Sequence, residues 1–216
     1  YSYLFESVHG GEKWGRYSII GLPCKKRIKI FGKKIIIENE GANSETHDVE
    51  DPLAWIESYQ QQFKVPDIEG LPKFTGGLVG YFGYETIRYI EPKLAGTIKP
   101  DVLETPDVLL MLSEEVVVFD NLSGKLYFIV MADPNNEKAY EDGRLRLSQL
   151  EKQLHQTVPT YKPSVKSVKV NEEDFVSGFT EDGFKAAVAK AKQYIVDGDI
   201  MQVVLSQRMT IPFSAE

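Results

Sequence analysis

The chain has 216 residues, of which 42% are hydrophobic and 26% are charged, and its formal net charge is −7 at neutral pH. A chain of this length can bury a substantial core and has room for one large domain or two small ones. The acidic balance disfavours nonspecific binding to nucleic acid or anionic membranes. Since no stretch approaches the roughly 20 apolar residues that cross a bilayer, we expect neither a nucleic-acid nor a membrane partner.

The first residues, "YSYLFES", have no initiating Met, basic region or cleavage signature, and we expect the sequence to be a piece of a longer chain. Its single cysteine, Cys24, excludes an internal disulfide framework. A lone cysteine fits a reducing compartment, so the expected localisation is cytoplasmic.

The first half of the chain is rich in strand-like segments. Runs of β-branched and aromatic residues, broken by Gly or Pro, predict strands at "YSYLF", "YSIIG", "RIKIF" and "KKIIIE". A short helix is predicted after Asp51, because Pro52 suits its first turn and Leu53 and Ile56 follow at helical spacing. Further strands are predicted at "GGLVGYFGY", "DVLLMLSEEVVVFD" and "KLYFIVMA", with "NLSG" as the turn before the last.

Glycine recurs at every third position of "GGLVGYFG", at Gly77, Gly80 and Gly83. This spacing differs from the G-x-G-x-x-G of phosphate-binding loops, and no βαβ pattern surrounds it. We therefore interpret these glycines as positions where strands approach closely or bulge.

Two longer helices are predicted in the second half. The capping carboxylate and proline at Asp133 and Pro134 indicate the start of the first. Residues 156–179 are polar and contain proline, which is typical of a linker. The second helix is capped by Thr180 and ended by Gly198. Its apolar face consists of Phe184, Ala187, Val188, Ala191 and Ile195.

A strand is predicted directly after this helix, in "DIMQVVLSQR". Met201, Val203 and Leu205 face one way, and Gln202 faces the other. The amide of Gln202 either meets solvent or lines a cavity with hydrogen-bond partners, since an unsatisfied buried amide costs about 1 to 3 kcal/mol. One helix and one strand cannot bury their own apolar faces, so the stretch from Thr180 onward should need partners that this chain does not contain.

Glu6 and Ser7 end the first predicted strand. An acid and a hydroxyl after an apolar run can recognise a ligand with an apolar body and an ammonium group, or they can be an ordinary strand end. Across the chain, many strands, several helices and no βαβ alternation predict an α+β fold with largely antiparallel sheets and flanking helices.

Three long stretches carry a resemblance to a known family: "YLFESVHGGEKWGRYSIIG", "GGLVGYFGYETIRYIE" and "FKAAVAKAKQYIVDGDIMQVVLSQR". In order and spacing the chain resembles component I of anthranilate synthase, one of the chorismate-utilising enzymes. The resemblance implies the N-terminal part of that family's two-sheet fold. Residues 1–155 would be the N-terminal region on the tryptophan-regulatory side, 156–179 a linker, and 180–216 the truncated start of the chorismate-binding catalytic domain.

The resemblance also implies a reaction. The family's enzyme is a lyase that converts chorismate and ammonia into anthranilate and pyruvate in tryptophan biosynthesis, with feedback inhibition by tryptophan. A separate glutamine amidotransferase subunit, component II, supplies the ammonia, and Mg²⁺ orients chorismate and assists departure of its hydroxyl. The Mg²⁺ ligands are expected outside this piece, which lacks most of the catalytic half and should be inactive alone.

The resemblance assigns roles to three residues. Water-using relatives carry a lysine where this chain has Gln202, in a K-V-V/I-L-S-R strand, and that lysine can act as a base toward water. Ammonia is already a nucleophile, so a neutral amide suits the amine-transferring branch. Glu6 and Ser7 match the family's L-L-E-S motif of the tryptophan feedback site, with Phe5 replacing the second leucine. The opposite wall of that site comes from an N-P-S-P-Y-M segment absent here.

Two other interpretations stay open. Component I of aminodeoxychorismate synthase shares the fold and the type of partner, although "ES" after the apolar pair and "VVLSQR" favour the anthranilate branch. The alternative from another class is a noncatalytic ligand-binding module, which a natural reading frame ending near Glu216 would favour.

Overall fold

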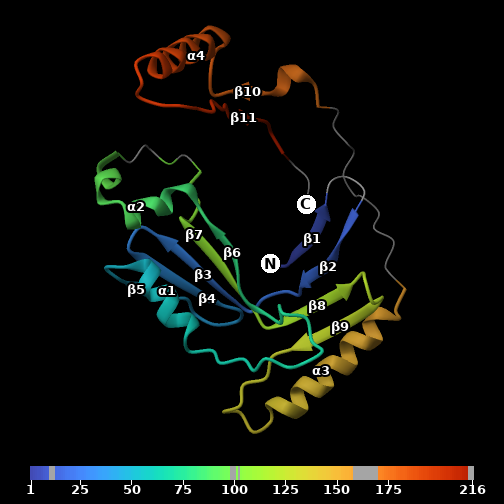
Figure 1. Cartoon of the computed structure of the whole chain (residues 1–216). Coiled ribbons are helices and arrows are strands. Elements are labelled where there is room, and N and C mark those ends of the chain that lie inside the picture. Colours follow the sequence, from blue (N-terminus) through green and yellow to red (C-terminus); the bar gives the residue numbers. More distant parts are fainter. Residues whose placement is uncertain (10–12, 98–100, 102, 158–169, 214–216) are drawn as a thin grey trace. The chain divides into compact units, whose positions relative to one another are not determined.

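The computed structural model describes residues 1–9, 13–97, 101, 103–157 and 170–213 (Figure 1). These residues belong to two compact units, Tyr1–Gln156 and Thr157–Glu216, and each is described by itself. Every strand pair in the described residues is antiparallel, and helices flank the sheets. The predicted α+β class is thereby confirmed. No helix in these ranges combines the length and the apolar character needed to cross a bilayer.

The first unit contains two sheets. The four-stranded sheet has the order β1-β2-β8-β9 and consists of β1 Tyr3–His9, β2 Lys13–Gly21, β8 Glu115–Asp120 and β9 Lys125–Val130. The five-stranded sheet has the order β5-β4-β3-β7-β6 and consists of β3 Lys26–Phe31, β4 Lys34–Asn39, β5 Glu45–Asp48, β6 Gly77–Phe82 and β7 Val108–Ser113. The strands predicted in the first half all form.

Helix α1, Pro52–Gln60, covers one face of the five-stranded sheet. It begins where the sequence predicts, because the Asp51 carboxylate accepts hydrogen bonds from the backbone N–H groups of Leu53 and Ala54, both at 3.0 Å. Ile56 and Tyr59 of α1 join the main core. The sheet residues of this core are Ile28, Ile30, Ile35, Ile37, Val108 and Leu110. Alternation along β3, β4 and β7 thus directs branched apolar side chains toward the helix.

The segment "DVLLMLSEEVVVFD" forms two strands rather than one continuous run. β7 ends at Ser113, Glu114 lies between, and β8 begins at Glu115 in the other sheet. Three polar residues, Ser113, Glu114 and Glu115, interrupt the apolar run, but this pattern does not show that the chain leaves one sheet for the other here.

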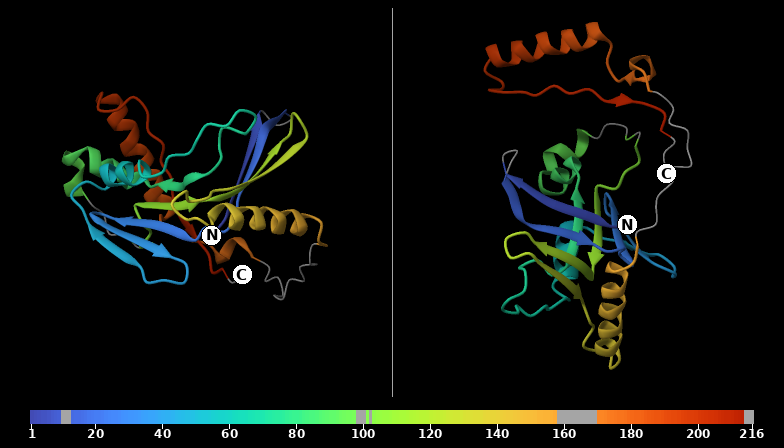
Figure 2. Two further views of the ribbon diagram at one scale, coloured as in Figure 1. Left: turned by 90° about the horizontal axis from the view of Figure 1, so that it is seen from below. Right: turned by 90° about the vertical axis from the view of Figure 1, so that its right-hand side faces the viewer.

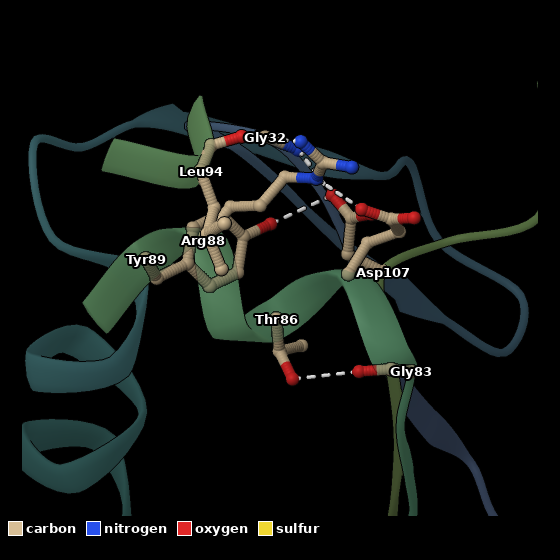
Figure 3. A network of polar contacts seen from close by, with 8 residues as sticks. Gly32, Gly83, Thr86, Arg88, Tyr89, Leu94 and Asp107 are labelled. Atoms are coloured by element: carbon tan, nitrogen blue, oxygen red, sulfur yellow. Dashed lines mark hydrogen bonds and ion pairs between the residues drawn. The ribbon is translucent and has the colours of Figure 1, made fainter. Parts of the chain in front are cut away.

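Short helical turns follow β6: η1 Tyr84–Thr86, α2 Ile87–Ile90 and η2 Pro92–Thr97. Figure 3 shows how polar contacts hold them. The Tyr89 hydroxyl donates to Oδ2 of Asp107 at 2.7 Å, and the Gly32 N–H donates to the same oxygen at 2.7 Å. Burial and the bond to this carboxylate raise the pKa of Tyr89. One carboxylate therefore joins α2 to the β3–β4 turn, where Gly32 has a φ of +57°.

Helix α3, Ala139–Leu154, starts later than predicted. At the predicted start, the Asp133 carboxylate instead accepts from the backbone and side-chain amides of Asn135, both at 3.0 Å, which closes a local turn. The helix lies along β9 (Figure 1). Its Arg146 binds both carboxylate oxygens of Glu115 in β8 at 2.8–3.0 Å. Leu150 is its buried residue.

The second unit contains η3 Glu172–Asp174, β10 Val176–Ser177, α4 Glu181–Val196 and β11 Met209–Thr210. The predicted ends of α4 are confirmed. The Thr180 hydroxyl accepts from the Gly183 N–H at 3.1 Å, and Gly198 follows the helix with a φ of +81°. Of the predicted linker 156–179, residues 158–169 lie outside the described residues.

The strand predicted over "DIMQVVLSQR" is wrong for this structure. Residues 202–208 have no regular structure, and β11, Met209–Thr210, begins only after this stretch. A strand needs a neighbour to take up its backbone hydrogen bonds, and no described strand pairs with this stretch. Three of its apolar side chains are exposed to solvent, Met201 by 97%, Val203 by 42% and Val204 by 82%.

Candidate functional site

The sequence candidates Glu6 and Ser7 lie at an irregularity between β1 and β2. Pairing is regular up to Glu6 and resumes at Val8, whose partner is Trp14. Ser7 alone therefore lies opposite residues 15–17 of β2, which makes a bulge in that strand. Bulges re-aim side chains and are frequent next to functional sites. The side chain of Ser7 lies outside the described part of the structure.

An open pocket with a volume of about 520 Å³ lies at this bulge. Its lining consists of Leu4, Phe5, Glu6, Gly15, Arg16, Tyr17 and Ile19. Leu4 and Phe5 remain 57% and 50% exposed, and Glu6 is also exposed. The pocket thus offers apolar surface together with one carboxylate and one guanidinium, a combination that suits a small zwitterion with an apolar body.

Arg16 fastens the bulge to the end of β8. Its Nε and Nη2 donate to the two carboxylate oxygens of Asp120 at 3.2 and 3.1 Å. Asp120 is only 2% exposed, and the hydrogen bonds from Arg16 lower its pKa to about 2. The Asn121 side chain also donates to the Gly15 carbonyl at 2.9 Å. The wall of the pocket is therefore held by a buried, ionised carboxylate.

Sequence reasoning missed Arg16, Asp120 and Asn121. One signal was present, because Gly15 interrupts a strand-like run and a glycine inside a strand often marks a bulge. The pairing of Arg16 with Asp120 spans 104 positions, and no local pattern could indicate it.

The third candidate, Gln202, belongs to the second unit. It lies in the extended stretch between α4 and β11, and its side chain is exposed. Neighbouring Val203 and Val204 are 42% and 82% exposed. Glu6 and Ser7 thus belong to one unit and Gln202 to the other, and the roles assigned to these three residues stay predictions.

The described residues do not fit a Mg²⁺ site. Among them, no three His, Cys, Asp or Glu side chains gather closely enough to hold a metal ion. The paired acids Asp197 and Asp199 flank Gly198 at the end of α4, where the amide of Gln193 donates to Asp197 at 2.7 Å.

Comparison with known proteins shows the family to which the chain is similar. The family described as chorismate binding enzyme matches residues 7–216. Proteins named anthranilate synthase component 1 from Pseudomonas putida and Pseudomonas aeruginosa are 50% and 49% identical, over 99% of this chain and 44% of theirs. The namesake from Acetivibrio thermocellus is 38% identical over 97% of this chain and 43% of its own length.

A solved structure supports the fold. The crystal structure of anthranilate synthase component I from Streptococcus pneumoniae TIGR4 matches with a TM-score of 0.72 and 26% sequence identity. The match covers 97% of this chain and 46% of that one. The chain therefore spans less than half the length of the relatives it matches.

Proposed function

Because the chain belongs to the family of chorismate-binding enzymes, we propose that it is the N-terminal part of an anthranilate synthase component I. The observation that carries this proposal is 50% identity over 99% of the chain to a protein of that name. The proposed enzyme is a lyase that converts chorismate and ammonia into anthranilate and pyruvate for tryptophan biosynthesis.

The proposed partner is a glutamine amidotransferase. The relatives are named as component 1, which implies a second component. In the proposed complex that subunit releases ammonia from glutamine, and this chain's protein receives the ammonia at chorismate.

Gln202 is proposed to form part of the wall beside the chorismate ring. Its amide does not take up a proton near neutral pH, so it neither repels protonated ammonia nor activates a competing water as a base. This neutrality would favour amination over hydration. Exposed apolar neighbours such as Val204 support the proposal that this stretch is covered by other parts of the protein when the site is complete.

Glu6 and Ser7 are proposed to form one side of a regulatory site for tryptophan. The pocket at the β1–β2 bulge supports this proposal, since Leu4, Phe5 and Ile19 supply apolar surface for an aromatic ring and Glu6 supplies a partner for the ammonium. The pocket is open, so the affinity of this half alone should be weak. Mg²⁺ is proposed to be held by residues other than the described ones.

The test is an assay of the longest natural protein that contains this sequence. Incubated with chorismate, Mg²⁺ and an ammonium salt, it should produce anthranilate, which is measured by fluorescence and mass spectrometry. The 216-residue chain assayed in parallel should produce none. Formation of aminodeoxychorismate, or of no product, by the longer protein would refute the proposed function.

A further inference from the structure

The second unit closes on itself through a very short ladder. β10 and β11 are joined by two residue pairs, Val176 with Thr210 and Ser177 with Met209. The Gly178 N–H adds a bond to the Arg208 carbonyl at 2.9 Å. A ladder of this length provides few contacts that distinguish one strand register from the next, and registers are weakly specified in such pairings.

A side-chain hydrogen bond supplements this ladder. The Ser177 hydroxyl donates to Oε1 of Gln207 at 2.9 Å and accepts from the Phe179 N–H at 3.1 Å. The bond links a residue of β10 to the residue two positions before β11. A slip of one residue would remove the Gln207 oxygen from Ser177, so the pair favours a single register.

The stretch between α4 and β11 is held extended by its two ends. α4 has 16 residues and is about 24 Å long at 1.5 Å per residue. The ten residues 199–208 reach at most about 33 Å, and they must run back along most of that helix, as Figure 2 shows. At the α4 end the Asp199 N–H donates to the Tyr194 carbonyl at 2.9 Å.

Residues 202–208 have no regular structure, so no side-chain alternation sets the direction of Gln202. The β10–β11 ladder and the end of α4 instead anchor the two ends of the stretch. A one-residue slip at β11 would change the number of residues between these anchors by one, which is about 3.3 Å of extended chain. The register set at Gln207 thus affects where Gln202 lies between the anchors.

We propose that Ser177 and Gln207 are positioning residues, which fix the register of β11 against β10 and so the position of Gln202 between the ladder and the end of α4. Their contribution to catalysis rests on the proposed function of Gln202, whereas their contribution to register does not. The two parts are therefore tested separately.

The register is tested in the 216-residue chain by amide hydrogen exchange at Gly178, whose N–H reports the ladder. Ser177→Ala and Gln207→Ala should each accelerate this exchange about fivefold, the factor that corresponds to loss of one typical hydrogen bond. Ser177→Thr keeps the hydroxyl and should restore the wild-type rate. Gln193→Ala removes an amide bonded to Asp197 in the same unit and should leave Gly178 unchanged. Equal exchange in all variants would overturn the proposal.

The catalytic part is tested in the longer natural protein by a double-mutant cycle. Ser177→Ala should lower the ratio of ammonia-derived to water-derived product about fivefold, and Ser177→Thr should restore it. In a Gln202→Ala background, Ser177→Ala should have no further effect on the ratio, because it acts through Gln202. Independent effects of the two substitutions would overturn this part. A wild-type protein that makes no anthranilate refutes the proposed function but leaves the exchange result standing.

Discussion

Replacement of Gly80 by alanine should strongly destabilise the first unit. A Cβ at this position would lie 1.8 Å from the Leu109 carbonyl oxygen, although real contacts of this kind are not shorter than 3.0 Å. Strands β6 and β7 would have to separate locally by about 1.2 Å, the difference between 3.0 and 1.8 Å. Overpacking costs about 1 to 3 kcal/mol where side chains can yield. Here the obstacle is backbone, so we expect about 3 kcal/mol or more.

Urea denaturation followed by tryptophan fluorescence measures this effect. Both tryptophans, at positions 14 and 55, belong to the unit Tyr1–Gln156, so the signal reports that unit. With m-values of about 1 to 3 kcal/mol/M, the midpoint should fall by about 1 to 3 M. Gly96→Ala is the control, because no described atom lies within 4 Å of its added Cβ. Equal midpoints for both variants would refute the interpretation of Gly80 as a close-approach position.

Three further predictions concern the candidate sites. The pKa of Asp120, lowered to about 2 by Arg16 from an ordinary value of 3.8, means that protonation favours the unfolded chain. This stabilisation should be complete above about pH 4 and lost as the pH falls toward 2. In Arg16→Met the urea midpoint should therefore depend less on pH over that window. A pH dependence equal to that of the wild-type chain would contradict this reasoning. In the longer natural protein, Gln202→Lys should raise the ratio of water-derived to ammonia-derived product, measured by mass spectrometry, and an unchanged ratio would exclude the proposed role. Calorimetric titration of the 216-residue chain with tryptophan should show weak or no binding at the Glu6 pocket, so micromolar affinity would show that this half suffices.

The sequence predicted those elements whose signals are local. Asp51 and Thr180 each cap a helix at the predicted residue, because a cap needs only a side-chain oxygen and the N–H groups two or three positions on. Gly198 likewise adopts the positive φ that ends α4. At Asp133 the same local chemistry misled the prediction, since its carboxylate closes a turn with Asn135 before the helix begins.

The misses depend on partners distant in sequence. The switch between sheets at Glu114 follows from which strands pair with β7 and β8, and the polar residues at this point do not indicate which sheet each strand joins. The stretch around Gln202 has a strand pattern but no described strand beside it, so period-two alternation alone did not produce a strand. For the candidate site, Leu4, Phe5 and Glu6 of the L-F-E-S motif line the pocket, whereas the pairing of Arg16 with Asp120 emerged only from the fold.

The one-residue connection between β7 and β8, at Glu114, affects how the first unit unfolds. β7 lies between β3 and β6 in one sheet, and β8 lies between β2 and β9 in the other, with a single residue separating them. Displacement of β7 from its sheet should therefore also displace β8 from the other sheet, and the reverse should hold as well. Although the two sheets share no ladder, they should melt as one cooperative block, with the amides of residues 108–120 opening only in the global transition.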